Sequence, residues 1–92
     1  MIFDFNDEKN ELLFKTRGIT FNQVIDVIEE EGILLNFDHP NKEKYPNQKI
    51  FVIEINKYTY CVPYVIDEDI IFMKTIYPSR NFLYLLKENK ND

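Results

Sequence analysis

The chain has 92 residues, of which 45% are hydrophobic, 15% aromatic and 29% charged, and it contains 2 Gly and 4 Pro. This length suits one domain, residues 1–92, and this composition excludes collagen-like, low-complexity and intrinsically disordered proteins. Because Cys61 is the single cysteine, no internal disulfide can form. Stability must therefore come from an apolar core, which 8 Phe and 6 Tyr can supply.

The chain is acidic, with 11 Lys and Arg against 16 Asp and Glu and a net charge of −5. A field of this sign repels nucleic acid, so any RNA or DNA site must be formed by a local group of cations. The acidic start, Met1–Glu8, lacks the basic and apolar regions of an export signal, and no apolar run reaches the length of a bilayer span. We therefore expect a cytoplasmic protein without a membrane role.

Two helices are predicted in the first third of the chain. Asn6 is a candidate N-cap for a helix that ends at Arg17. Thr20 and Gln23 form a T-x-x-Q capping box, which indicates that a second helix begins at Phe21. The apolar residues of this second helix recur at i, i+3, i+4 and i+7 and should face a core; they are Phe21, Val24, Ile25 and Ile28.

The rest of the chain favours strands and a final helix. Short connections between the later runs are typical of an antiparallel meander, and Ser79 can cap the last helix. Apolar residues at both parities of the middle runs indicate a sheet that is covered on both faces. We predict an α+β fold of order β-α-α-β-β-β-β-α, in which a small antiparallel sheet packs against two N-terminal helices and one C-terminal helix. The predicted strands after the second helix are Ile33–Phe37, Gln48–Ile55, Tyr58–Ile66 and Ile70–Tyr77.

Several kinds of catalytic chemistry lack the residues that they need. One His and one Cys, without H-E-x-x-H or C-x-x-C spacing, leave no credible metal-ligand set. Cys61 lies in the middle of a predicted strand, where a buried and inert thiol is the usual outcome. The two glycines are isolated at helix ends and form no phosphate-binding loop. We therefore expect neither a metal nor an organic cofactor.

The segment Phe72–Arg80 is the best candidate for binding an anion. A strand that carries Lys74 leads through Tyr77 and a proline turn into a helix with Arg80 in its first turn. Backbone N–H groups at a helix start favour an anion, and a guanidinium beside them can hold a phosphate through two hydrogen bonds. The alternative is that Arg80 pairs with a surface acid and that Lys74 is a solvated strand residue.

Three further polar residues have two interpretations each. Lys15 and Arg17 form a second basic pair, but both also complement the dipole at the end of the first helix. His39 lies in a loop with two prolines, where it is either a general acid or base or a histidine that simply faces solvent.

Three runs occur in a recognisable order along the chain: Phe-Asp-Phe-Asn-Asp-Glu-Lys-Asn at 3–10, Arg-Gly-Ile-Thr-Phe at 17–21 and Phe-Met-Lys-Thr-Ile-Tyr-Pro-Ser-Arg at 72–80. Together they resemble the BrnT family of bacterial toxins, a branch of the RelE-like ribonucleases. The runs at 45–50 and 60–65 resemble the subgroup whose signature is Lys-Thr-Ile-x-Pro-Ser-Arg. Many family members carry a His before the glycine of the first interhelix turn, where this chain has Arg17, and many are basic.

The resemblance implies a toxin that is encoded with a cognate antitoxin and that cleaves RNA, free or ribosome-bound, without a metal or cofactor. Attack by a ribose 2′-hydroxyl on the adjacent phosphate needs a proton acceptor, a cation and a proton donor. On this basis Arg80 would stabilise the phosphorane and Tyr77 would orient the substrate. Lys74 and Lys15 would bind phosphate or transfer protons. The residues expected to contact RNA are Lys15, Arg17, Ser79 and His39.

A non-catalytic protein-binding module, derived from an inactive toxin, is the alternative from another class. The acidic balance favours it, because it weakens attraction to RNA. A short final helix also cannot bury all of its large residues in so small a domain, which leaves apolar surface for a partner or for a second copy in a homodimer. These residues are Phe82, Leu83, Tyr84 and Leu86.

Overall fold

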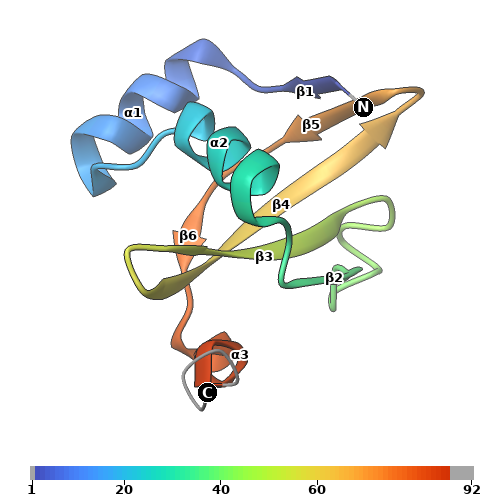
Figure 1. The fold of residues 1–92 in the computed structure, drawn as a ribbon. Helices are drawn as coiled ribbons and strands as arrows, with labels where there is room; N and C mark the ends of the chain where they lie inside the picture. Colours follow the sequence, from blue (N-terminus) through green and yellow to red (C-terminus); the bar gives the residue numbers. More distant parts are fainter. Residues whose placement is uncertain (1, 88–92) are drawn as a thin grey trace.

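The chain folds into one six-stranded mixed sheet with helices packed on both faces (Figure 1). The computed structural model describes residues 2–87. The predicted α+β class, with two N-terminal helices and one C-terminal helix, is confirmed. In chain order the elements are β1 (Ile2–Asp4), α1 (Asp7–Arg17), α2 (Phe21–Glu31), β2 (Leu35–Asp38), β3 (Lys49–Ile55), β4 (Tyr58–Asp67), β5 (Ile70–Met73), β6 (Tyr77–Pro78), the 3-10 turn η1 (Arg80–Phe82) and α3 (Tyr84–Lys87).

The strand order across the sheet is β1-β5-β4-β3-β2, and β6 pairs with β4 beyond the end of β5. Strands β2 to β5 pair antiparallel, as the meander predicts, but β1 runs parallel to β5. The prediction of a purely antiparallel sheet is therefore wrong at this edge. Two helices and three strands separate Ile2 from its partner Ile70, and no local turn signal can mark so distant a pairing.

The strand predicted at Ile70–Tyr77 is interrupted. Met73 of β5 lies opposite Tyr64, whereas Tyr77 of β6 lies opposite Cys61, so three residues on this edge face two residues of β4. One extra residue in an antiparallel pair is a β-bulge, which bends the strand and changes the direction of its side chains. Side-chain alternation alone predicts a continuous strand, because the extra residue becomes visible only once the pairing register is known.

Helices α1 and α2 begin and end where their capping signals predict. The side chain of Asn6 accepts the N–H of Lys9 at 2.9 Å, and that of Thr20 accepts the N–H of Gln23 at 3.1 Å. Gly18 ends α1 with φ of +68°, which is a left-handed conformation that favours glycine. Both helices cover one side of the sheet, hereafter the α1–α2 face. Its buried residues include Leu13, Phe21, Val24, Phe51, Ile53 and Val62.

The opposite side, hereafter the α3 face, is covered by the C-terminal residues. Ile50, Val52 and Cys61 form a buried cluster there, and Phe82 and Leu85 pack against it. Apolar residues at both parities of β3 predicted cover on both faces, and the two clusters confirm that prediction. The α3 face therefore owes its cover to a short segment that follows the last strand.

Two further elements differ from the predicted ones, besides shifts of one residue at the start of β3 and at the end of β4. The strand expected at Ile33–Phe37 is Leu35–Asp38, because two residues after Gly32 are used to cross from α2 to the sheet edge. The final helix is split into η1 and a four-residue α3. Ser79 is still bonded to β4, so the chain must turn sharply to return apolar side chains to the sheet. No helix within residues 2–87 is long and apolar enough to cross a membrane.

Asn10 connects α1 to the start of α2, and its removal is expected to destabilise the fold. Its Oδ1 accepts the N–H of Phe21 at 2.7 Å, and its Nδ2 donates to Asn22 Oδ1 at 2.9 Å. Asn10→Ala should lower the free energy of unfolding in urea by about 1–2 kcal/mol, because a part-buried N–H loses its acceptor. Asn22→Ala removes only the exposed contact and should cost less. Equal losses in the two variants would contradict this account.

Candidate functional site

The β-bulge at residues 74–76 shapes the segment that carries the predicted site. The N–H of Lys74 donates to the carbonyl of Pro63 at 2.8 Å, which continues the ladder one residue past β5. Ile76 is fully buried on the α1–α2 face, whereas the Lys74 side chain is exposed with its Nζ 5.4 Å from the centroid of the Phe72 ring. The bulge therefore directs an apolar group into the core and a cation into solvent within three residues.

Arg17 reaches this segment from the end of α1. Its guanidinium donates a hydrogen bond to the carbonyl oxygen of Ile76, 59 residues further along the chain. This carbonyl lies on the edge of the sheet that β1 leaves open, so the guanidinium supplies a partner that no strand provides there. Lys15 lies in the same last turn of α1 and is exposed. The sequence allows two interpretations of this basic pair. Arg17 has a specific structural partner in Ile76, in addition to a favourable position on the helix dipole.

Tyr77 lies on the α3 face beside the thiol of Cys61, its neighbour across the β4–β6 pair. Burial is the main cause that raises the pKa of the Tyr77 phenol, and the adjacent Cys61 adds to it. Burial also raises the pKa of the Cys61 thiol, although hydrogen bonding with Tyr77 and Ser79 opposes the shift. At neutral pH the phenol is therefore a proton donor, and the thiol is the buried, inert group expected from its position in the strand.

Ser79 and Arg80 follow β6, and Thr59 holds them in place. The N–H of Ser79 donates to the carbonyl of Thr59 at 2.9 Å, and the Thr59 hydroxyl donates back to the Ser79 carbonyl. The Ser79 hydroxyl accepts the N–H of Asn81 at 3.4 Å, which starts the η1 turn. Nothing in the sequence singles out Thr59, because a threonine in a strand is ordinary until its partner across the sheet is known.

Arg80 is exposed at the first position of η1. The predicted helix start at this residue is a 3-10 turn of three residues, which aligns few peptide dipoles. Any attraction for an anion at this position must come from the guanidinium itself.

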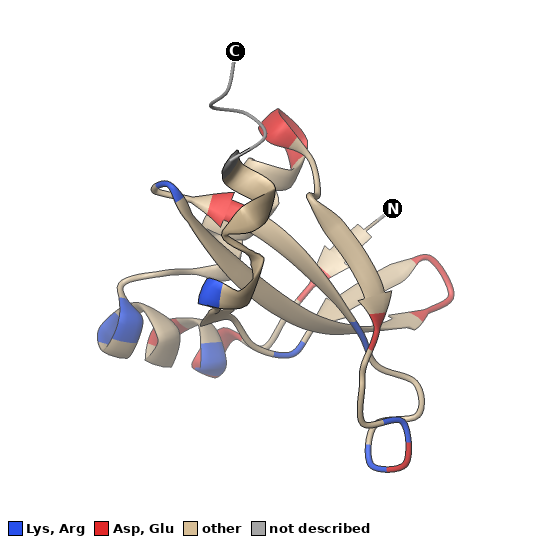
Figure 2. Cartoon of the chain, turned by 90° about the horizontal axis from the view of Figure 1, so that it is seen from below, with Lys and Arg blue, Asp and Glu red and all other residues tan. Residues whose placement is uncertain are grey.

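Arg17, Lys74 and Arg80 are spaced along one edge of the sheet, where Arg17 approaches from the α1–α2 face and Lys74 lies over Phe72 on the α3 face. Strand geometry places the backbones of Lys74 and Arg80 roughly 15–20 Å apart, with the bonded Arg17–Ile76 pair between them. Figure 2 shows basic positions on α1 and near the C-terminal turn, whereas the acidic turn between β4 and β5 forms a separate group. The structure thus places Arg17 against the segment that carries Lys74, Tyr77 and Arg80.

His39 does not join this edge. It follows β2, three strands away from β5, or roughly 14 Å across the sheet. Its Nδ1 accepts the N–H of Asn41 at 3.1 Å, and its ring lies 4.5 Å from that of Tyr45. This placement contradicts a role for His39 in proton transfer at a site formed by Arg80 and Tyr77.

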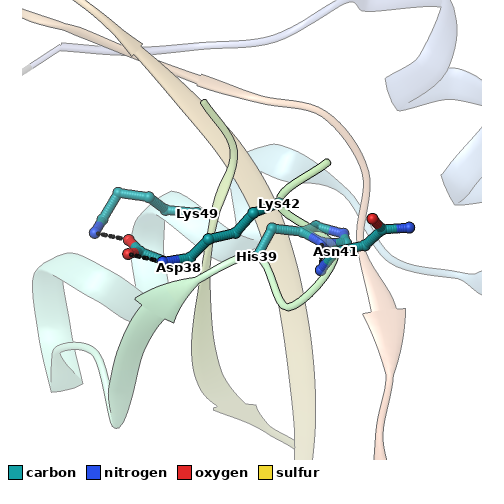
Figure 3. Close-up of polar contacts among 5 residues, drawn as sticks. All are labelled: Asp38, His39, Asn41, Lys42 and Lys49. Carbon is teal, nitrogen blue, oxygen red and sulfur yellow. Dashed lines mark hydrogen bonds and ion pairs between the residues drawn. The ribbon is translucent and has the colours of Figure 1, made fainter. Parts of the chain in front are cut away.

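Asp38, next to His39, forms ion pairs with two lysines (Figure 3). Its carboxylate contacts Lys49 Nζ at 2.9 Å and Lys42 Nζ at 3.5 Å. The hydrogen bond and charge of Lys49, followed by those of Lys42, lower the pKa of Asp38, and Asp38 in turn raises the pKa of Lys49. Both pairs are exposed and contribute little to stability.

Within residues 2–87, no group of three or more His, Cys, Asp or Glu side chains could hold a metal ion. No protein-family model, curated protein or solved structure matches the chain.

The raised pKa values of Cys61 and Tyr77 predict a loss of stability in alkali. Both groups hold their protons more tightly in the folded chain, so their contribution is complete below the unfolded-state pKa and is lost as pH rises through the folded-state pKa. We expect the free energy of unfolding in urea to fall above about pH 8.5–9, where an unfolded thiol begins to ionise. The fall should be shallower in the double variant Cys61→Ala, Tyr77→Phe; an unchanged slope would mean that other groups cause it.

Proposed function

We propose that the chain is a cytoplasmic RNA-cleaving toxin that arrests translation and is held inactive by a cognate antitoxin. The observation that carries the proposal is the hydrogen bond from Arg17 to the Ile76 carbonyl. It brings a cation from the N-terminal half of the chain to the edge on which Lys74, Tyr77 and Arg80 lie. Cations spaced along one edge beside a neutral phenol suit the phosphates of a single RNA strand. The motifs that resemble the BrnT family support the same proposal.

In the proposed reaction the ribose 2′-oxygen attacks the adjacent phosphorus and its proton passes to a base. The bond from phosphorus to the 5′-oxygen breaks, and that oxygen takes up a proton. The products are a 2′,3′-cyclic phosphate and a 5′-hydroxyl, and the atoms balance without a cofactor. Such a step needs a cation close to the phosphorane and groups that can exchange protons.

Each role is proposed for a residue on the edge. Arg80 would donate hydrogen bonds to the non-bridging oxygens as charge develops in the transition state. Tyr77, whose pKa is raised by burial, would donate a hydrogen bond that orients the phosphate rather than accept a proton. Lys74 and Lys15 are both exposed and would bind flanking phosphates or transfer protons. Ser79 would contact RNA next to Arg80. Arg17 would also contact RNA while its hydrogen bond to the Ile76 carbonyl stays in place.

The second candidate is a protein-binding module without catalysis. Of the large side chains on the C-terminal segment, Tyr84 is 54% exposed, whereas Leu86 is buried. A clearer reason for the second candidate is found on α1, where Leu12 is 52% and Phe14 is 62% exposed. Exposed apolar side chains on a short helix suit a protein partner or a second copy of the chain. Both candidates predict partner binding, so RNA cleavage is the measurement that separates them.

Arg80→Ala should abolish toxicity while leaving the fold intact. Loss of a cation that stabilises transition-state charge is expected to slow cleavage about a hundredfold or more. The test is growth of a bacterial host that lacks the antitoxin after induction of each variant, with RNA and newly made protein sampled within minutes. The matched control is Lys9→Gln, which removes a positive charge near the opposite end of α1.

Wild type and Lys9→Gln should both stop translation and yield RNA fragments ending in a cyclic phosphate. Full toxicity of Arg80→Ala would refute the assigned role of Arg80. Absence of RNA cleavage by wild type would refute the toxin proposal and favour the binding module.

A further inference from the structure

Part of the α3 face remains open beyond the cover of η1 and α3. Pairing of Val65 with Phe72 places both residues at the same level of β4 and β5. Just before the next strand, Gln48 lies at this level, one residue before the Lys49–Tyr64 pair, and its carbonyl accepts the N–H of His39 at 3.0 Å. Phe72 on β5 and Val65 on β4, with Gln48 just before β3 and His39 just after β2, therefore form a row across the sheet, hereafter the cross-sheet row.

The cross-sheet row faces the same side as Cys61. Val65 is four residues from Cys61 along β4, and alternate side chains of a strand share a face. Each of the four side chains is half-buried, unlike the fully covered cluster of Ile50, Val52 and Cys61 beside it. The row is thus a part-exposed band of apolar and planar groups at the margin of the α3 face.

Each end of the band has an aromatic ring with a lysine beside it. At one end, Lys74 Nζ lies 5.4 Å from the centroid of the Phe72 ring. At the other end, the His39 ring lies 4.5 Å from that of Tyr45, and Lys44 Nζ lies 5.4 Å from the Tyr45 ring. Flat rings on a sheet can stack two or three bases, and adjacent cations can contact the phosphates between them.

We propose that the cross-sheet row with Tyr45 and Lys44 is a stacking platform for single-stranded RNA. This proposal rests on the proposed function and extends it. The RNA strand that is cut near Arg80 would continue past Lys74 and cross the sheet toward Tyr45. Double-stranded RNA is a poor ligand because its bases are already paired and stacked. His39 has a place here as part of the platform, away from the cleavage step.

The charges around the row set the path of the RNA backbone. Asp4 pairs with Phe72 at the outer end, and the turn of Asp67, Glu68 and Asp69 lies beyond it, so phosphates are repelled from that side. Asp38 projects away from His39 and neutralises charge on Lys42 and Lys49 (Figure 3). The backbone is therefore expected to enter on the Lys74 side of Phe72 and to cross the row toward Lys44, which lies at the same end of the sheet as the acidic turn. Removal of the Asp4 charge, as in Asp4→Asn, should strengthen binding.

The test uses 2′-O-methyl RNA of three and eight nucleotides, which cannot be cleaved because its 2′-oxygen is blocked. Fluorescence anisotropy at low salt gives the Kd of the full chain and of Phe72→Leu, Tyr45→Leu and Phe72→Tyr. Loss of one stacking contact is expected to weaken binding of the eight-nucleotide strand about fivefold or more, with little change for three nucleotides. Phe72→Tyr keeps a ring and should bind like wild type. Tyr84→Leu, which removes an exposed ring outside the row, is the matched control.

Three outcomes would overturn the platform. Wild-type cleavage of RNA together with unchanged Kd values in Phe72→Leu and Tyr45→Leu would refute the platform while the proposed function stands. Equal affinity for double-stranded and single-stranded RNA would show that the protein attracts the phosphate charges of RNA and does not stack its bases. Loss of antitoxin binding, rather than of RNA binding, in the same two variants would make the row a protein interface. No detectable RNA binding or cleavage by wild type would refute the proposed function itself.

Discussion

Pairing along β4 is the constraint on which the rest of the structure depends. Its ten residues, Tyr58–Asp67, bond to β3 on one side and to both β5 and β6 on the other. A slip of one residue would exchange the side chains of two faces that are both packed, so this register is strongly specified. The bulge shifts the register by one residue, which buries Ile76 and leaves its carbonyl available to Arg17. The candidate site follows from that shift.

An acidic chain can still attract an anion locally, because salt limits the range of each charge. Exposed charges more than about 8 Å apart are largely screened at physiological ionic strength. The acids between β4 and β5 lie at one end of the sheet, and Asp38 is engaged with Lys42 and Lys49 at another edge. The net charge of −5 therefore does not describe each local surface, and the acid closest in register to Arg80 is Glu54, which lies opposite Thr59, the partner of Ser79.

Local signals predicted the elements that local contacts form. The side chains of Asn6 and Thr20 bond within their own helix turns, so their spacing in the sequence was sufficient. The parallel pair of β1 with β5 was missed because its partners meet only in the folded chain. Within the site, proximity along the chain linked Lys74 to Arg80, but the contact of Arg17 with Ile76 depends on where α1 ends over the sheet. His39 was misplaced for a related reason, since a loop position does not indicate which sheet edge it flanks.

The parallel pairing of β1 also bears on how the molecule assembles during synthesis. The hairpin of β3 and β4 closes through two residues and can form early, whereas β1 is made before β5 and must wait for it. Closing so long a loop is slow, since its entropy is lost before any contact forms. Ile2 and Phe3 thus remain unpaired until Ile70 and Ile71 have been made. The sheet edge that β1 forms can therefore be completed only after α1, α2 and strands β2 to β5 have been made.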